Sequence, residues 1–315
     1  MTSRYLVTGG AGFIGSHIVE RLLKEGCFVR VLDNFSSGKR ENLTLAGATS
    51  GKGNFELVEG DIRDKSICNR AAQGVDYVLH QAALRSVPKS LKTPHEFNAV
   101  NIDGTLNLLE ASLESKVKRF VCASSSSIYG EAEKFPEEEG DRPKLISPYA
   151  LSKLANEFYC RIFTENYGLE TVSLRYFNVF GPRQALDDEY AVVIPKFIHC
   201  ILHDEQPPIF GTGKQSRDFT YIDNVVEANI LSATTKGVRN EVFNVAFGLD
   251  TTVLELVEYL NKIIGKNIKP KFLPVRLGDA FRTCADISRI KAKLEFKPKV
   301  NFEDGLKMTV DSFRK

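Results

Sequence analysis

Short apolar runs alternate with amphipathic segments through the first half of the chain. One amphipathic segment, from about Phe13 to Glu25, has the spacing of a helix and separates the first two apolar runs. Near-continuous apolar strands that alternate with helices are typical of a parallel sheet with helices on both faces. The sequence therefore predicts an α/β fold with a Rossmann-type doubly wound parallel sheet, whose expected strands are residues 4–9, 27–33, 55–61, 75–83, 119–125 and 171–179.

The alternation breaks after Asn178, where several prolines interrupt the chain and shorter helices follow. Residues 241–248, "EVFNVAFG", look like a later strand that returns to the sheet. We therefore expect one large domain and a smaller C-terminal lobe. The expected division is a sheet domain at 1–178 with a returning segment at about 218–247, and a lobe at 179–217 and 248–315.

The composition is typical of an enzyme and gives no sign of a nucleic-acid or membrane partner. The chain has 315 residues and a net charge of +2, with 42 basic residues against 40 acidic ones. No dense Lys/Arg tract occurs, so we expect neither a nucleic-acid nor a membrane partner. The apolar runs are too short to span a bilayer, and none resembles an N-terminal signal. Six scattered cysteines without a C-x-x-C pair predict no zinc site and no disulfide framework, which favours the cytoplasm.

A glycine-rich stretch, "TGGAGFIGSHI", follows the first strand directly and opens the first helix. Gly9, Gly12 and Gly15 are spaced G-x-x-G-x-x-G. Such a loop needs glycine for its tight turn, for close approach of the backbone to a pyrophosphate, and for packing of helix on strand. The helix N-terminus then presents N–H groups and a partial positive charge to the anion. By itself the motif also suits an ordinary strand-to-helix turn.

Asp33 strengthens the interpretation of the glycine loop. It ends the second predicted strand, 18 residues after Gly15, where an acidic side chain is expected to bind the adenosine ribose of a dinucleotide. A carboxylate at this place repels a 2′-phosphate. The strand, loop, helix and acid together predict a site for NAD rather than NADP.

The stretch "SPYALSK" places Tyr149 four residues before Lys153, so both side chains share one face of a predicted helix. A lone Y-x-x-x-K pair is usually surface decoration. Here the strand at 119–125 ends in "ASSSSIYG", so several hydroxyl groups reach the sheet edge where ligands of open α/β sheets bind. A nearby ammonium favours the ionised form of a phenol. Serine, tyrosine and lysine beside a nicotinamide would transfer protons in alcohol–ketone chemistry.

Seven motifs carry a resemblance to a known family: "TGGAGFIGSH", "LDNFSSG", "EGDIRD", "HQAAL", "SSSSIYG", "SPYALSK" and "RYFNVFGPRQ". Together they resemble the extended short-chain dehydrogenase/reductase family of nucleotide-sugar epimerases and dehydratases. The likeness covers essentially the whole chain, in order, and is greatest to the UDP-glucose and UDP-N-acetylglucosamine 4-epimerases. It implies an NAD-binding sheet domain and a C-terminal lobe that binds a UDP-sugar.

The resemblance also implies roles for individual residues. The catalytic group would be Ser125, Tyr149 and Lys153. Residues expected to bind NAD are Gly9, Gly12, Phe13, Ile14, Gly15, Asp33, Asn34, Ser36, Gly38, Asp61, Ile62, Gln81, Ala82, Ala83, Asn101, Tyr149, Lys153 and Phe177, the last at the nicotinamide. Residues expected to bind the UDP-sugar are Arg85, Ser86, Ser125, Ser127, Tyr149, Asn178, Val193, Arg217, Arg276, Asp279 and Thr283.

Three reactions of the family compete, and the end of the fifth strand separates them. The 4,6-dehydratases resemble T-D-E-V-Y-G there and the uronate decarboxylases S-E-V-Y-G, whereas this chain has a serine in place of the glutamate, within Ser125–Gly130. Dehydration needs a carboxylate for the C5 proton, so we expect plain oxidation and re-reduction at C4. A non-catalytic NAD-binding scaffold is the hypothesis from another class, but such proteins usually lose the tyrosine or the lysine.

The preferred sugar is predicted from one side chain. Glucose-only epimerases resemble this chain but carry a bulky tyrosine at the position of Thr283. A small side chain there leaves room for a 2-N-acetyl group, and "ALRSVPKS" and "YAVVIPKF" resemble the subgroup that acts on N-acetylated sugars. We therefore expect UDP-GlcNAc and UDP-GalNAc as preferred substrates, with UDP-Glc and UDP-Gal as poorer ones.

Other features have plainer interpretations. His80 ends an apolar strand and is expected in the core, while His199 and His203 share a helix face without a third metal ligand. The segments "IDGTLNLLEASLESK" and "SKLANEFYCRIFTENYG" are amphipathic helices. In relatives such helices pair across a two-fold axis, so we expect a homodimer through a four-helix bundle.

Overall fold

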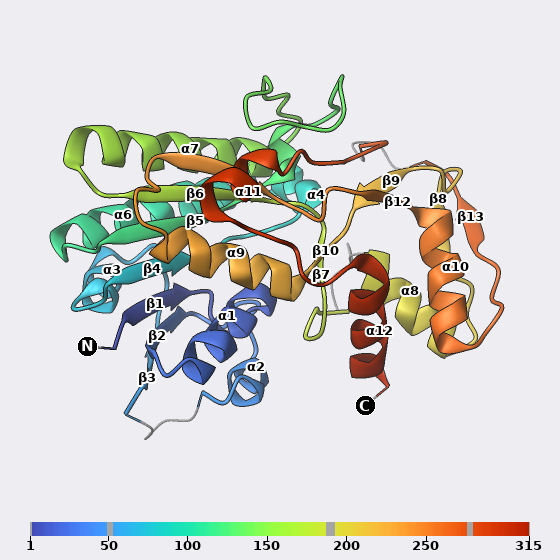
Figure 1. Cartoon of the computed structure of the whole chain (residues 1–315), viewed down its shortest axis with the longest axis horizontal. Helices are drawn as coiled ribbons and strands as arrows, with labels where there is room; N and C mark the ends of the chain where they lie inside the picture. The colour runs from blue at the N-terminus through green and yellow to red at the C-terminus, as the bar shows by residue number, and fades with distance from the viewer. Residues whose placement is uncertain (1, 49–52, 187–192, 276–279, 315) are drawn as a thin grey trace.

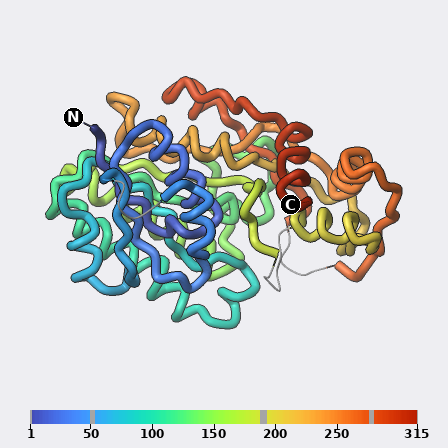
Figure 2. Tube along the Cα trace, turned by 90° about the horizontal axis from the view of Figure 1, so that it is seen from below, coloured from blue at the N-terminus to red at the C-terminus, as the bar shows by residue number. Residues whose placement is uncertain are grey.

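The computed structural model describes residues 2–48, 53–186, 193–275 and 280–314. Figure 1 shows a large sheet with helices on both sides and, at one end, a smaller group of helices and short strands. In Figure 2 this smaller group, made of later parts of the chain, again lies to one side of the large sheet.

Seven parallel strands form the central sheet in the order β11-β6-β5-β4-β1-β2-β3. The order reverses between β1 and β4, so a crevice opens beyond their carboxyl ends. All six strands predicted in the first half are present, and the predicted returning strand pairs with β6. Their bounds are β1 Arg4–Thr8, β2 Phe28–Asp33, β3 Phe55–Glu59, β4 Tyr77–His80, β5 Arg119–Ser125, β6 Thr171–Tyr176 and β11 Glu241–Val245.

Alternation along the strands builds one core on each face of the sheet. In β1, Tyr5 and Val7 pack with helices α1 (Phe13–Lys24) and α9 (Ile222–Thr234). Leu6 points the other way, into a second core with three helices. Those helices are α3 Lys65–Ala72, α6 Gly104–Glu114 and α7 Pro148–Tyr167. The Rossmann-type α/β class predicted from the sequence is confirmed.

Within the residues that the structure describes, the smaller group contains three two-stranded sheets, in which β10 pairs with β7, β12 with β9 and β13 with β8. The strand bounds are β7 Val179–Phe180, β8 Pro208–Phe210, β9 Ser216–Asp218, β10 Thr220–Tyr221, β12 Asp250–Thr252 and β13 Lys271–Leu273. The remaining helices are α2 Arg40–Leu45, α4 Val87–Lys92, α5 Pro94–Phe97, α8 Val193–Leu202, α10 Val253–Ile264, α11 Ser288–Leu294 and α12 Phe302–Phe313, with a π-helical turn η1 at Asn98–Asp103 and a 3-10 turn η2 at Ser126–Ile128.

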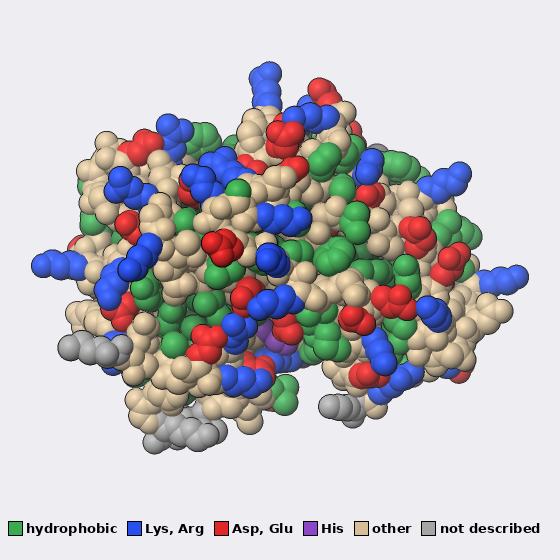
Figure 3. All heavy atoms as spheres, viewed as in Figure 1, with side chains coloured by type: hydrophobic (Ala, Val, Ile, Leu, Met, Phe, Trp, Pro, Cys, Tyr) green, Lys and Arg blue, Asp and Glu red, His purple; other side chains and the backbone are tan. Residues whose placement is uncertain are grey.

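Figure 3 shows acidic and basic side chains interspersed over the visible face. Within the described residues no helix is both long enough and apolar enough to cross a membrane. All six cysteines are free thiols.

Candidate active site

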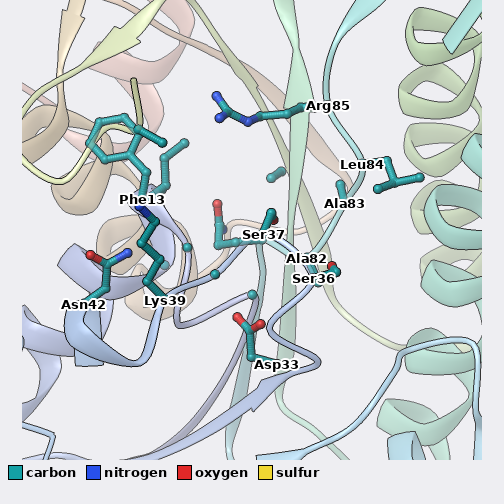
Figure 4. Close-up of a pocket in the computed structure, with 18 of the residues that line it drawn as sticks. Phe13, Asp33, Ser36, Ser37, Lys39, Asn42, Ala82, Ala83, Leu84 and Arg85 are labelled. Atoms are coloured by element: carbon teal, nitrogen blue, oxygen red, sulfur yellow. The ribbon is translucent and has the colours of Figure 1, made fainter. Parts of the chain in front are cut away.

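A cavity of about 1070 Å³ opens beyond the carboxyl ends of the central strands. Figure 4 shows Phe13, Lys39 and Asn42 on one side of it and Ala83 and Leu84 on the other. Most of the residues singled out from the sequence line this one cavity. They are Gly9, Gly12, Phe13, Ile14, Gly15, Asp33, Asn34, Ser36, Gly38, Asp61, Ile62, Gln81, Ala82, Ala83, Arg85, Ser125, Tyr149, Lys153 and Asn178.

The glycine loop leaves no room for side chains. A Cβ on Gly9, whose φ is +67°, would lie 2.8 Å from the Ala82 nitrogen, and one on Gly15 would lie 2.1 Å from the Gly9 oxygen. Helix α1 begins after Gly12, which has no side chain to cap the first amides. An uncapped helix N-terminus behind a glycine turn is suited to a pyrophosphate. The loop therefore fits a dinucleotide in the way that the motif predicts.

Asp33 is fixed at the edge of the cavity by two main-chain amides. Its Oδ2 accepts the Ala11 N–H at 2.9 Å, and its Oδ1 accepts the Phe35 N–H at 2.8 Å. Burial raises the pKa of this carboxyl, although both hydrogen bonds act in the opposite direction. The carboxylate that we expect to bind the ribose is thus also the group that orders the glycine loop.

A second acidic group lies beside it. Asp61 accepts a hydrogen bond from Asn34 Nδ2 at 2.8 Å and two from the guanidinium of Arg63, at 2.8 and 3.0 Å. These bonds, above all those from Arg63, hold the pKa of Asp61 well below its usual range. Arg63 lines the cavity but was not predicted, because an arginine on a loop gives no motif by itself.

The face of β6 that meets the cavity differs by one residue from the prediction. Phe177 is fully buried and is not among the cavity-lining residues, whereas its neighbours Tyr176 and Asn178 are. Phe177 instead packs in the hydrophobic core on the α1 and α9 face of the sheet. The Tyr176 hydroxyl donates to Gln81 Oε1 at 3.1 Å and accepts from Asn229 Nδ2 at 2.8 Å. Burial raises the pKa of Tyr176.

Tyr149 and Lys153 lie together at the start of α7. Ser147 caps this helix by accepting the Ala150 N–H at 3.1 Å, which places Tyr149 in the first turn. The Lys153 ammonium lies 6.0 Å from the centroid of the Tyr149 ring and donates to the Ala123 carbonyl of β5 at 2.9 Å. A buried lysine anchored in this way presents its charge to the phenol from a fixed position.

The serines after β5 take different positions. Ser125 lines the cavity and accepts the Ser127 N–H at 3.2 Å. The Ser127 hydroxyl is buried, has no hydrogen-bond partner and does not line the cavity. Ser86 caps α4 by accepting the Lys89 N–H at 3.3 Å. The structure thus brings Ser125 to Tyr149 and Lys153, but it gives Ser86 a helix-capping position.

Asn101 supports the wall of the cavity from behind. It lies buried in the π-helical turn η1. Its Oδ1 accepts the Leu84 N–H at 2.8 Å, and its Nδ2 donates to the Leu84 carbonyl at 3.0 Å. It also donates to Ser152 of α7 at 3.0 Å. The loop after β4 is therefore tied to the helix that carries Tyr149.

Among the predicted residues of the smaller lobe that the structure describes, Thr283 contacts a residue that lines the cavity, while Arg217 and Val193 are not among the lining residues. Asn178 Nδ2 donates to the Thr283 hydroxyl at 3.1 Å. Arg217 Nη1 donates to the carbonyls of Ser216 and Phe281, at 2.8 and 3.3 Å. Val193 begins α8. Arg276 and Asp279 lie outside the described residues.

The histidines need no catalytic explanation. His80 is buried between Thr8, whose hydroxyl lies 2.7 Å from Nδ1, and Thr105, whose hydroxyl lies 2.9 Å from Nε2. Burial lowers its pKa to about 3, and the core position predicted for it is confirmed. Over the described ranges no cluster of three or more His, Cys, Asp or Glu side chains is arranged to hold a metal.

Fold and cavity together define a dinucleotide-dependent enzyme of the extended short-chain dehydrogenase/reductase class. The family model described as the NAD dependent epimerase/dehydratase family matches residues 5–246, and the chain belongs to that family. NAD is accordingly its cofactor, and the residues of the glycine loop and the end of β2 fit it.

Solved structures of similar chains cover the molecule from end to end. A UDP-N-acetylglucosamine 4-epimerase from Methanobrevibacter ruminantium is 43% identical, with a TM-score of 0.94 over 100% of this chain and 99% of that one. A UDP-glucose 4-epimerase from Thermotoga maritima is also 43% identical, with a TM-score of 0.92 over 99% and 98%. Among curated proteins, a UDP-glucose 4-epimerase from Mycolicibacterium smegmatis is 36% identical over 99% of this chain and 98% of its own.

Proposed function

We propose that this NAD-dependent UDP-sugar 4-epimerase interconverts UDP-GlcNAc and UDP-GalNAc, and acts on UDP-Glc and UDP-Gal less well. The observation that carries the proposal is the placement of Ser125, Tyr149 and Lys153 on the same cavity as the glycine loop. When bound there, NAD supplies an acceptor, and later a donor, for the hydride at C4 of the sugar.

The chain's own residues handle the proton. Tyr149 takes the proton of the sugar 4-hydroxyl when the 4-keto sugar forms, and returns it when the opposite epimer is made. The Lys153 ammonium stabilises the phenolate electrostatically from its anchor on the Ala123 carbonyl. Ser125 hydrogen-bonds the same sugar oxygen. The keto sugar then rotates within the cavity, so that its other face meets the returning hydride.

The serines of η2 favour epimerisation over the other reactions of the family. The family's dehydratases and decarboxylases resemble sequences that have a glutamate after the catalytic hydroxyl residue. In this chain, residues 124–128 are four serines followed by Ile128. A serine hydroxyl cannot serve as the carboxylate base that C5 proton abstraction needs. We therefore propose no elimination step.

The proposal is tested by incubating the purified protein with UDP-GlcNAc and with UDP-Glc, separately and without added NAD, and resolving the C4 epimers. We expect UDP-GalNAc to form, and UDP-Gal to form more slowly, because the cofactor stays bound between turnovers. No C4 epimer from either sugar, or a strict requirement for added NAD, would contradict the proposal.

Thr283→Tyr is expected to exclude the acetylated sugars selectively. A tyrosine adds a ring beside Asn178, in the space where the 2-N-acetyl group is proposed to lie. We expect kcat/KM for UDP-GlcNAc to fall at least about tenfold more than kcat/KM for UDP-Glc. Thr283→Ser is the control, because it retains the hydroxyl that bonds Asn178. An equal loss of both activities would remove the size argument.

We also propose that the enzyme is a homodimer that pairs through α6 and α7. Leu151, Phe158 and Ile162 follow one another on one face of α7 and are 53%, 54% and 42% exposed. Contiguous apolar side chains of this size mark contact surfaces more often than open ones.

We further propose that the protein works in the cytoplasm, because its free thiols fit a reducing compartment.

The double change Leu151→Glu and Phe158→Glu is expected to yield monomers. It places two carboxylates on each protomer, so four like charges would meet in the dimer interface. Molar mass by light scattering after gel filtration gives the result. Lys307→Glu, at an exposed position of α12, is the matched control and should leave the dimer intact. A dimer that survives the double change would place the interface elsewhere.

A further inference from the structure

Two buried carboxyl groups outside the cavity bind one stretch of chain. Glu137, in the loop between β5 and α7, and Asp218, at the end of β9, are both 0% exposed. Glu137 Oε2 accepts the Cys284 N–H at 2.7 Å, and Asp218 Oδ2 accepts the Ala285 N–H at 3.2 Å. Consecutive amides of this stretch are thus held by carboxyl groups from two separate parts of the fold.

The main chain completes the attachment of residues 281–286, which we name the wall segment. On one side, the Glu137 N–H donates to the Cys284 carbonyl at 2.7 Å, and the Asp286 N–H donates to the Glu137 carbonyl at 2.8 Å. On the other side, the Ser216 N–H donates to the Phe281 carbonyl at 3.0 Å. The wall segment therefore lies between the loop after β5 and strand β9.

A hydrogen bond of Thr283 connects the wall segment to the cavity. Thr283 Oγ1 accepts from Asn178 Nδ2 at 3.1 Å, and Asn178 lines the cavity. The same Nδ2 donates to the Asp218 carbonyl at 3.2 Å. Asn178 has a φ of +31°, so its backbone is also held in a region that few side chains adopt. The position of its amide depends on where the wall segment lies.

The charges around the two carboxyl groups are unbalanced. Burial raises the pKa of Glu137 and of Asp218 to about 7, and the carboxylate of Asp218 adds to the effect on Glu137. Asp141 from the same loop raises the pKa of Glu137 further, and Asp250 from β12 raises that of Asp218, while the hydrogen bond from the Cys284 amide and the charge of Arg282, which pairs with Asp250, lower that of Glu137. The Oε1 atom of Glu137 is buried without a hydrogen-bond partner.

We propose that Glu137 and Asp218 are positioning residues of the substrate cavity, which hold the wall segment where Thr283 orients the Asn178 amide toward the bound UDP-sugar. The inference rests on the proposed function, because it assigns the sugar nucleotide to the cavity beside Asn178. Neither residue lines the cavity, and both act through the main chain of the wall segment.

Glu137→Ala is the principal test. It leaves the buried Cys284 amide without an acceptor, so we expect KM for the UDP-sugar to rise about tenfold while kcat changes less than about threefold. NAD content should be unchanged. Glu137→Gln keeps an oxygen acceptor and should restore the KM that the wild type has at pH 6. Glu138→Ala, which removes an exposed carboxylate from the same loop, is the matched control and should change nothing.

Hydrogen exchange measures the attachment without turnover. Peptides that cover residues 281–287 should exchange faster in Glu137→Ala than in the wild type or in Glu138→Ala. The affinity for UDP, measured by calorimetry, should fall in parallel. A wild-type protein that epimerises no UDP-sugar would refute the proposed function alone. Hydrogen exchange and UDP affinity would still test the positioning role, because neither measurement needs turnover.

The pH dependence gives a test that needs no destabilised variant. Both folded-state pKa values are raised, so both groups bind protons more tightly in the folded than in the unfolded protein. Their contribution to stability is complete at acidic pH and is lost as the pH rises through about 7. Above about pH 7 both groups ionise and repel each other as buried like charges, which should loosen the wall segment, so we expect KM to rise between pH 6 and 8.5 in the wild type and much less in Glu137→Gln. Equal slopes in the two proteins, or an unchanged KM in a folded Glu137→Ala, would overturn the proposal.

Discussion

Tyr149→Phe is expected to lower epimerase turnover by about 10³-fold while the protein still carries NAD. The change removes only the hydroxyl that we assign to proton transfer, and general acid–base catalysis commonly contributes 10² to 10⁴ in rate. A loss of about 10³ corresponds to about 4 kcal/mol in the activation free energy. The ring can keep its edge-on contact with Phe97, whose centroid lies 6.3 Å away, so the start of α7 should be undisturbed.

The measurement is kcat with UDP-GlcNAc, together with the NAD released per protein on denaturation. Tyr159→Phe is the control: it removes a hydroxyl from the same helix, at a residue that does not line the cavity. We expect the control to retain full activity. A Tyr149→Phe protein that keeps more than a few per cent of the activity would refute the assignment of the phenol.

Gly15→Ala is expected to abolish NAD binding. The added methyl group would lie 2.1 Å from the Gly9 oxygen and 2.8 Å from the Gly10 Cα, which is closer than atoms can approach. These contacts are to main chain, so relief requires movement of the loop on which the pyrophosphate is expected to lie. We expect at least about a tenfold drop in NAD content, with activity that added NAD does not restore.

Gly140→Ala is a matched control for that change. A methyl group on Gly140 meets nothing within 4 Å, and this glycine has no positive φ. The control should purify with the wild-type content of NAD, measured by absorbance of the acid extract. Full NAD content in Gly15→Ala would show that the glycine loop is not where the cofactor binds.

The parts of the fold that follow from local patterns were predictable from the sequence. The strands of the sheet are short apolar runs between turns, and the glycine loop needs small residues at fixed spacing. The helical i, i+4 rule places Tyr149 and Lys153 on one side of α7. Each of these inferences depends on residues that are close together in the chain.

The parts that the sequence did not reveal depend on contacts between distant residues, or on which of two adjacent side chains at the end of a strand faces the cavity. Phe177 and Tyr176 are adjacent aromatic residues, and only their packing decides which one meets the cavity. Glu137 reaches Cys284 across the fold, and no spacing rule links them. The π-helical turn that carries Asn101 has no sequence pattern that separates it from an α-helix.

The central claim is that the hydrogen at C4 of the sugar leaves and returns within one cavity, under the control of Tyr149 and Lys153. The most direct test is epimerisation of UDP-GlcNAc labelled with deuterium at C4, in ordinary water, followed by mass spectrometry and NMR of the UDP-GalNAc formed. We expect the deuterium to be retained at C4 and no solvent hydrogen to enter at C5. Loss of the label to solvent, or exchange at C5, would contradict the account.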